Sequence, residues 1–332
     1  MQVSIRDVAA HARVSMATVS NTLNNPSRVS KKMRTRVEAA IAELGYVPNE
    51  SARALRIGRS REIGLLVNDI RNPFFADLAH GADTAADDFG DVVTLCSSAG
   101  SAERERRQLR RLASQHVKGI IINPIDLDSL DPRDLLGSDT PIVVIARRPP
   151  GHSHCSVWVD DVAGGELAAG HLIEQGHRRL AFIGSFANRL RGVRHAMSTY
   201  NVNPETLVEI PTDGTLDGGR SGGSRFAAMD PSIRPTGVVC GNDLIALGVL
   251  HAMAVANLRV PEDAALVGYD DIDYGAAATT PLTTIRQPRE EIGRSAVRLL
   301  LEEIADKAAH QHRAVVFPPE LIIRHSAPKT PV

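Results

Sequence analysis

From Glu62 to near the end of the chain, short apolar runs alternate with longer stretches of helical periodicity. The apolar runs have the length of strands and are continuous, which is typical of parallel strands covered on both faces. Alternation of this extent predicts an α/β domain built on doubly wound parallel sheets. We expect strands at 63–67, 92–95, 120–122, 142–145, 180–183, 237–239 and 265–268, and helices at 74–88, 104–115, 164–175, 243–255 and 289–305.

The first 47 residues have a different pattern, which predicts three short helices. Ser4 and Asp7 have the spacing of a capping box that opens a helix through about Ala12, Ser15 precedes a second helix to about residue 23, and Ser30 precedes a third that ends at 44–45. Two short helices joined by a tight turn predict a helix-turn-helix, whose second helix enters the major groove of DNA. The expected core of this head is Val8, Val19, Leu23, Val37, Ile41 and Leu44.

Charge is distributed unevenly between these two parts of the chain. Residues 1–61 contain 11 Lys and Arg against 4 Asp and Glu, a net +7, whereas the remainder contains 27 against 35, a net −8. A basic head on an acidic body predicts that the head contacts a polyanion while the body stays away from it. Double-stranded DNA is therefore the expected partner of the head.

Cysteine usage and the N-terminal sequence predict a soluble protein of the cytoplasm. Cys96, Cys155 and Cys240 lie far apart with no CxxC motif, so a disulfide framework is not indicated. The first residues lack the pattern of a signal peptide, and no apolar run is long enough to span a bilayer.

Three motifs that would indicate an enzyme or a metal site are weak. The GxSxG pattern at 219–223 follows a polar stretch rather than the apolar strand that a nucleophile elbow needs, and no GxGxxG follows the first expected strand. The pairs His152/His154 and His310/His312 have no cysteine or carboxylate at metal-binding spacing. We expect exposed loop histidines, and neither catalytic residues, a cofactor nor a metal site.

The segment from Ser4 to Asn24, SIRDVAAHARVSMATVSNTLN, resembles the N-terminal signature of the LacI/GalR repressor family. The resemblance continues through 29–30, 43–46 and 48–49, and through 281–285 to 319–321. It implies a sequence-specific DNA-binding transcriptional regulator, most often a repressor, that acts as a homodimer and whose operator binding is modulated by a sugar-like effector. The alternative is a sugar-binding transport protein, which should lack the basic head and carry a signal peptide.

The family architecture implies a DNA-binding head, a hinge and a sensing domain. The sensing domain is similar to periplasmic sugar-binding proteins, with two lobes and three crossovers between them. The implied boundaries are 1–47 for the head, 48–61 for hinge helix and linker, and 62–332 for effector binding and dimerisation, with one lobe at about 62–160 plus 288–318 and the other at about 161–287 plus 319–328.

The resemblance also implies which residues contact DNA. Met16, Ala17 and Asn21 match positions that face base edges, although family members often carry Arg at the position of Asn21 and Gly at that of Arg13. In the hinge helix, a leucine from each subunit wedges into the minor groove; the alternative for Leu55 is packing on the sensing domain. The remaining implied contacts are Ser4, Ser15, Thr18, Ser20, Asn49, Ala52 and Arg53, of which the serines and the threonine have helix capping as their alternative.

Polar residues that follow expected strands match sugar contacts in ribose-binding proteins and pentose-sensing repressors. Carboxylates and an arginine suit vicinal hydroxyls, amides supply donor and acceptor, and phenylalanines suit the apolar faces of a sugar ring. The alternative is that Asn72 and Asn242 cap helices while Phe74 packs in the core. Arg189 is preferred over Arg191 because it precedes Gly192 by three residues, although the loop after Gly184 is shorter than usual in the family. The implied set is Asn72, Phe74, Phe75, Asp126, Arg189, Asn242, Asp270 and Gln287.

Overall fold

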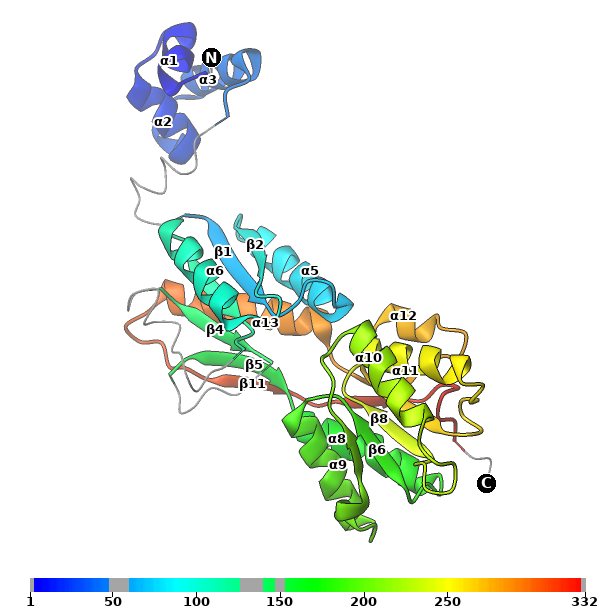
Figure 1. The fold of residues 1–332 in the computed structure, drawn as a ribbon. Coiled ribbons are helices and arrows are strands. Elements are labelled where there is room, and N and C mark those ends of the chain that lie inside the picture. The colour runs from blue at the N-terminus through cyan, green and yellow to red at the C-terminus, as the bar shows by residue number, and fades with distance from the viewer. Residues whose placement is uncertain (1–2, 48–59, 126–139, 147–152, 330–332) are drawn as a thin grey trace. The chain divides into compact units, whose positions relative to one another are not determined.

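The computed structural model describes residues 3–47, 60–125, 140–146 and 153–329. The chain divides into two compact units, one over residues 1–60 and one over 61–332 (Figure 1). The first unit is helical and the second contains two parallel-sheet lobes, so the expected fold class is confirmed. Within the described residues, no helix combines the length and the apolar character needed to cross a membrane.

The head consists of α1 (Ile5–Ala12), α2 (Met16–Asn24), the short 3-10 helix η1 (Pro26–Arg28) and α3 (Lys31–Leu44). Each α-helix begins at a serine whose side chain accepts a backbone N–H, as expected from the sequence. Such a cap contributes about 0.5–2 kcal/mol to a helix. Of the expected core residues, Val8, Val19 and Val37 are buried, Ile41 and Leu44 are partly buried against them, and Leu23 is wrong because it is 38% exposed. The buried core is Val8, Ala9, Ala12, Val19, Val37 and Ala40.

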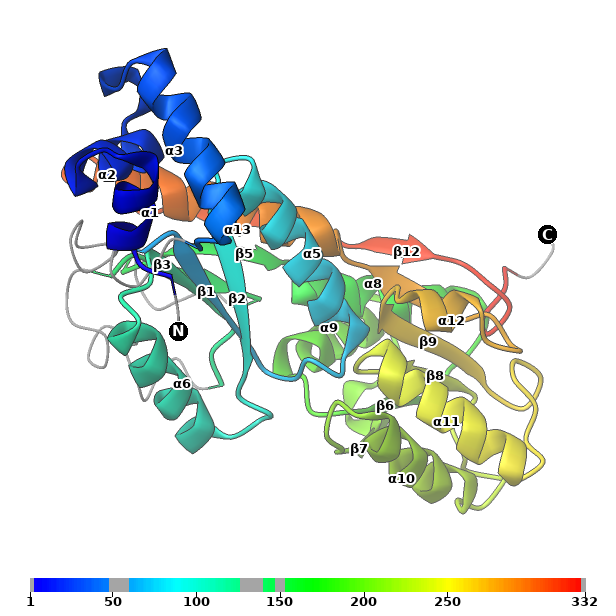
Figure 2. The same cartoon turned by 90° about the horizontal axis from the view of Figure 1, so that it is seen from above.

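The first lobe is a six-stranded sheet in which all strand pairs are parallel, in the order β11-β5-β4-β3-β1-β2. On one face α5 (Pro73–Asp87) and α13 (Arg289–Ala305) lie side by side, and α6 (Ala102–Ser114) covers the other (Figures 1 and 2). We call it the N-lobe. Its strands are β1 (Glu62–Val67), β2 (Val92–Ser97), β3 (Gly119–Ile122), β4 (Ile142–Ile145), β5 (Cys155–Val159) and β11 (Ala314–Phe317).

The second lobe, the C-lobe, is a six-stranded sheet in the order β12-β10-β9-β8-β6-β7, parallel except for β12. One face carries α8 (Asp161–Glu174) and α9 (Ala187–Thr199), and the other carries α10 (Leu216–Ala227) and α11 (Asp243–Val255) (Figure 1). The other elements are β6 (Leu180–Ile183), η2 (Pro204–Thr206), β7 (Val208–Ile210), β8 (Gly237–Cys240), β9 (Ala265–Asp270), α12 (Asp273–Ala276), β10 (Thr283–Arg286) and β12 (Glu320–Ile322).

Three short crossovers connect the lobes. The chain passes from β5 to α8 through Asp160, from β10 to α13 through Gln287 and Pro288, and from β11 to β12 through Pro318 and Pro319. Each crossover leaves the carboxyl end of a strand. Side chains that follow these strand ends therefore lie where the two lobes are joined, which is where ligands bind in open α/β sheets.

Candidate functional sites

The exposed face of α2 carries the residues that the sequence assigned to base contacts. Met16 is 47% exposed, Ala17 is exposed and Asn21 is half-buried, whereas Val19 on the opposite face is fully buried. Positions separated by three or four residues share a helix face, so Ala17 and Asn21 lie together. The face is accessible to a partner, and its contact with bases stays a prediction.

The other head residues of the predicted set have structural bonds of their own. Ser4 forms a reciprocal capping box with Asp7 at the start of α1, and Ser15 accepts the Thr18 backbone N–H at 3.1 Å. The Thr18 hydroxyl lies 2.9 Å from that of Ser15. Capping is therefore present at Ser4 and Ser15, which leaves phosphate contact as a second role still to be tested. Ser20 is half-buried on α2.

The turn between α1 and α2 requires a left-handed backbone at Arg13, with φ +51° and ψ +51°. Glycine adopts this conformation most easily, so an arginine here carries some strain. The hinge residues Asn49, Ala52, Arg53 and Leu55 lie outside the described residues.

In the C-lobe, Arg189 is placed by the close packing of α8 against α9. A Cβ added to Gly165 would lie 2.1 Å from the Arg189 carbonyl oxygen, and one added to Gly192 would lie 2.0 Å from that of Val162. Only glycine permits this approach, and it brings the first turn of α9 onto α8. Arg189 is 8% exposed, whereas Arg191 is exposed, so the buried arginine is the one that the sequence favoured.

The Arg189 guanidinium lies in a cage of acceptors and aromatic rings. Its Nε donates to Asp161 Oδ1 at 2.9 Å, and an Nη donates to the Gly241 carbonyl oxygen at 2.5 Å. The guanidinium carbon lies 3.6 Å from the ring centroid of Tyr269 and 4.8 Å from that of Phe186. Burial alone lowers the pKa of Arg189, but Asp161 and its other anionic neighbours outweigh burial and raise it. The side chain is a fixed cation.

Asp270 is the last residue of β9 and has a left-handed conformation, with φ +112°. It is 4% exposed, accepts a hydrogen bond from Gln287 Nε2 at 2.7 Å, and lies 3.6 Å from an Arg189 nitrogen. Burial raises its pKa to about 6, and this rise is opposed by Arg189 and by hydrogen bonds from Gln287 and Asn72. The unusual backbone and the buried carboxylate together indicate a functional position.

A second buried carboxyl, that of Asp243, interacts electrostatically with Asp270. Asp243 is fully buried, accepts the Thr284 hydroxyl at 2.7 Å and accepts the Ile272 backbone N–H at 2.9 Å. Burial, with Asp270 as the second cause, raises the pKa of Asp243 to about 8. Because each carboxylate disfavours ionisation of the other, the proton is held more tightly by Asp243 than by Asp270.

Asn72 joins the N-lobe to this cluster. It caps α5, where its Oδ1 accepts the Phe74 backbone N–H at 3.0 Å, and its side chain lies near enough to Asp270 to lower the pKa of that carboxyl. Phe74 and Phe75 lie in the N-lobe core with ring centroids 5.1 Å apart, so the packing alternative describes their positions. Contact between either ring and a ligand stays a prediction.

Asn242 caps α11, as its alternative stated. Its Oδ1 accepts the Ile245 backbone N–H at 2.8 Å, and its Nδ2 donates to the Gly214 carbonyl oxygen at 2.9 Å. It nevertheless directly follows Gly241, whose carbonyl oxygen binds Arg189. Asp126 lies outside the described residues. The structure therefore brings Asn72, Arg189, Asp270 and Gln287 together and places Asn242 beside them. We call these five residues, with Asp161, the polar cluster.

Sequence reasoning missed Asp161, Tyr269, Phe186 and Asp243. Asp161 carried a weak signal, because it follows Asp160 at the end of an apolar run. Tyr269 and Phe186 lie in or next to strand ends, but nothing in their spacing marks them as partners of a buried arginine.

Two of the motifs set aside have different outcomes. The GxSxG pattern lies inside α10 rather than at a strand-to-helix turn, and Ser221 is exposed on that helix. The expectation of exposed loop histidines without cysteine or carboxylate partners is wrong. His154 is buried, His310 and His312 are half-buried, and Cys155 and Glu303 lie against the latter two. The tertiary fold supplies these partners from distant positions. His152 lies outside the described residues.

Comparisons with known proteins assign both units. Residues 4–49 match bacterial regulatory proteins of the lacI family, and residues 169–327 match the periplasmic binding protein-like domain. The chain is 35% identical to the HTH-type transcriptional repressor PurR of Aliivibrio fischeri, over 97% of this chain and 98% of that protein. It is 33% identical to the ribose operon repressor of Escherichia coli, over 95% and 97%.

Solved structures show the same similarity. A lac repressor dimer bound to operator and the anti-inducer ONPF superposes with a TM-score of 0.86 at 28% identity, covering 99% of this chain and all of that one. A LacI family transcriptional regulator from Enterococcus faecium with bound ribose superposes with a TM-score of 0.73 at 29% identity, covering 80% and 98%.

Proposed function

Because the chain belongs to the lacI family of bacterial regulatory proteins, we propose that it is a repressor that binds operator DNA as a homodimer and responds to a pentose at the polar cluster. Its relatives of matching length are repressors, which argues against the transport-protein alternative. The proposed role of the cluster is to bind a ligand without transforming it.

The observation that carries the ligand assignment is the buried contact between Arg189 and Asp270, with Gln287 on the same carboxylate. An arginine and a carboxylate fixed this close together offer donors and acceptors at the spacing of vicinal hydroxyls. Gln287 lies on a crossover and Asn72 on the N-lobe, so a ligand bound here touches both lobes. The ribose bound to the Enterococcus faecium regulator supports a pentose.

A flat heteroaromatic ligand fits the cluster less well. Such a ligand needs an open aromatic face for stacking. Within the described part of the chain, the faces of Tyr269 and Phe186 at this cluster are turned to the Arg189 guanidinium. A polyhydroxylated ligand needs no aromatic face for stacking and requires only the hydrogen-bond donors and acceptors of the polar cluster.

The test is a gel shift on DNA from upstream of the protein's own gene, with ribose and related pentoses added, together with calorimetric titration of the free protein. We expect a specific complex that ribose or another pentose weakens. Arg189→Lys should abolish the pentose response and leave operator binding in place, whereas Arg191→Lys, an exposed change on the same helix, should alter neither. A response that survives Arg189→Lys would remove the cluster as the binding site.

A further inference from the structure

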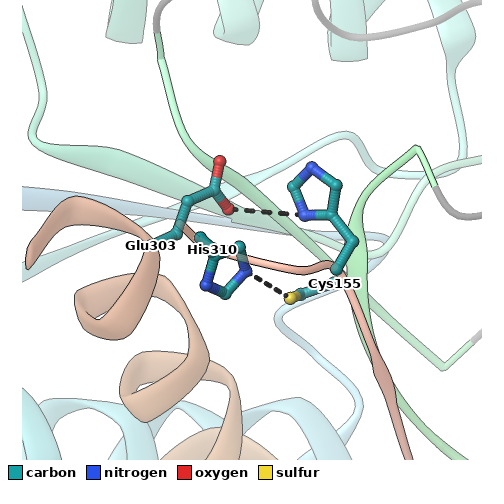
Figure 3. A group of neighbouring side chains, drawn as sticks. Cys155, Glu303 and His310 are labelled. Atoms are coloured by element: carbon teal, nitrogen blue, oxygen red, sulfur yellow. Dashed lines mark hydrogen bonds and ion pairs between the residues drawn. The ribbon is translucent and has the colours of Figure 1, made fainter. Parts of the chain in front are cut away.

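A second cluster of ligating side chains lies in the N-lobe, away from the crossovers. Cys155, Glu303, His310 and His312 each offer a ligand atom, and these four atoms all lie within 4.8 Å of one another. Figure 3 shows Glu303, His310 and Cys155 converging from a helix, a loop and a strand. We propose that these four residues bind a divalent metal ion of the zinc class.

The fold brings the four residues together from two distant parts of the chain. Cys155 begins β5, and His312 lies two residues before β11, which pairs with β5 in parallel from Ser156 and Ala314 onward. Glu303 lies in the last turn of α13, and His310 lies in the connection from α13 to β11. The cluster therefore lies at the amino ends of two neighbouring strands, whereas the polar cluster lies beyond carboxyl strand ends.

The side chains already interact in pairs. Cys155 Sγ and His310 Nε2 lie 3.1 Å apart, and His312 Nδ1 lies 3.9 Å from Glu303 Oε2. In a tetrahedral site with bonds of about 2.0–2.3 Å, neighbouring ligand atoms are separated by roughly 3.3–3.8 Å. The Cys155–His310 and Glu303–His312 pairs are already near this separation, and no two of the four ligand atoms are more than 4.8 Å apart. Side-chain rotations that move these atoms by about 1 Å would therefore give tetrahedral distances.

The donor set identifies the class of ion. One thiolate, two imidazoles and one carboxylate suit Zn²⁺, whereas Mg²⁺ and Ca²⁺ prefer sites of oxygen alone. Four protein ligands leave no open position, which is the arrangement of a structural rather than a catalytic zinc site. Cys155 and Glu303 are buried and the two histidines half-buried, so an ion bound here would be largely shielded from water.

The surroundings of Cys155 suit a metal-bound thiolate. The Arg313 backbone N–H points at its sulfur at 3.5 Å, a contact of the kind that stabilises the charge on a thiolate. Metal binding would displace the thiol proton of Cys155 to solvent and leave a thiolate bonded to the ion.

The experiment uses the full-length protein, freed of metal with a chelator and titrated with Co²⁺ and Zn²⁺. We expect one Co²⁺ per chain, with the intense d–d bands of a tetrahedral ion and a thiolate-to-cobalt charge-transfer band. Zn²⁺ should displace the cobalt and raise the Tm. Cys155→Ser should remove the charge-transfer band and lower zinc affinity by more than roughly 100-fold, since loss of even an outer partner of a metal ligand costs 10–100-fold.

The matched control is Cys96→Ser, a half-buried thiol on β2 at the opposite edge of the same sheet. It should bind cobalt with the wild-type spectrum. Failure of wild-type protein to bind Co²⁺ or Zn²⁺, binding without the charge-transfer band, or a band that persists in folded Cys155→Ser would each overturn the proposal. The wild-type spectrum decides the matter even if Cys155→Ser does not fold.

Discussion

Replacing Asp270 with asparagine should stabilise the protein while weakening its response to sugar. The Asp270 carboxylate is buried, and its pKa is raised from an ordinary value of 3.8 to about 6. Because the pKa is higher in the folded chain than in the unfolded one, the folded state holds the proton more tightly. Ionising Asp270 therefore costs stability. That cost is absent below about pH 4, grows as the pH rises and is fully present above about pH 7.

The size of the effect follows from the two pKa values. Their difference corresponds to about 3 kcal/mol, at about 1.36 kcal/mol for each unit of pKa. Asparagine keeps the shape of the protonated acid and accepts the Gln287 hydrogen bond, while Asp161 remains to neutralise Arg189. Asp270→Asn should therefore raise the free energy of unfolding at pH 7.5 by up to about 3 kcal/mol, and the gain should disappear near pH 4.

Sugar binding should change in the opposite direction. Charge-assisted hydrogen bonds from sugar hydroxyls to an ionised Asp270 are each worth about 1.5–3 kcal/mol, so Asp270→Asn should weaken binding by roughly ten- to a hundredfold. In the wild-type protein, affinity should be nearly full above about pH 7 and fall as Asp270 is protonated, to about half at pH 6 and about a tenth at pH 5. The variant should show no such fall between pH 7 and 5.

The assays are urea denaturation between pH 4 and 7.5 and titration calorimetry at the same pH values. Asp271→Asn is the matched control, because Asp271 pairs with Arg286 at 2.7 Å and with Arg324 at 2.7 Å. It should lose stability at pH 7.5 and retain sugar affinity. If Asp270→Asn is less stable than the wild type at pH 7.5, burial of the ionised carboxylate does not cost stability. If the variant has wild-type sugar affinity, Asp270 does not contact the ligand.

Three further predictions concern DNA. Asn21→Ala should lower the free energy of operator binding by roughly 1–3 kcal/mol and relax the base preference at one base pair per half-site, whereas Arg53→Ala should weaken binding to all DNA sequences evenly. An unchanged base preference of Asn21→Ala in a randomised-operator selection would show that the α2 register is wrong. Leu55→Ala should weaken operator binding about tenfold or more while leaving sugar affinity intact, and wild-type operator affinity in this variant would exclude the wedge. A homodimer with roughly 8 phosphate contacts should show a slope of about −7 for log K against log salt; a monomeric or salt-insensitive complex contradicts this.

The sequence predicted well those helices and caps that depend on residues close together in the chain. The three serine caps of the head lie where the spacing placed them, and α11 and α13 begin and end at the expected residues. Five strands were not among those expected: β5, β7, β10, β11 and β12. β7, β10 and β12 are short and contain charged or polar residues, so their sequences do not show the continuous apolar run that marks a central strand. β11, with the sequence AVVF, does show such a run and was missed.

The polar cluster was predictable as a set of positions but not as a bonded arrangement. Arg189, Asp270 and Gln287 were found through the resemblance to ribose-binding proteins and pentose-sensing repressors, and Arg189 and Asp270 also come after expected strands. Asp161 and Tyr269 were missed because their roles depend on Arg189, which reaches them only when α8 packs on α9. The prediction of exposed loop histidines was wrong for the same reason, because pairing of β5 with β11 brings Cys155 and His310 together.

A link between sugar and operator requires the ligand to bind one arrangement of the lobes more tightly than another. The polar cluster supplies such a difference, because Asp270 accepts a hydrogen bond from the crossover residue Gln287 and its pKa is lowered by the nearby amide of the N-lobe residue Asn72. Sugar hydroxyls that donate to the Asp270 carboxylate would add to its interactions with Asn72 and Gln287, or replace them, only in the arrangement of the lobes that keeps both residues beside it. The burial that makes the ionised carboxylate costly also excludes water, which strengthens each bond to the ligand. The sugar therefore binds most tightly to the arrangement of the lobes that keeps Asp270 buried. This difference in sugar affinity between arrangements is what can change the affinity for the operator.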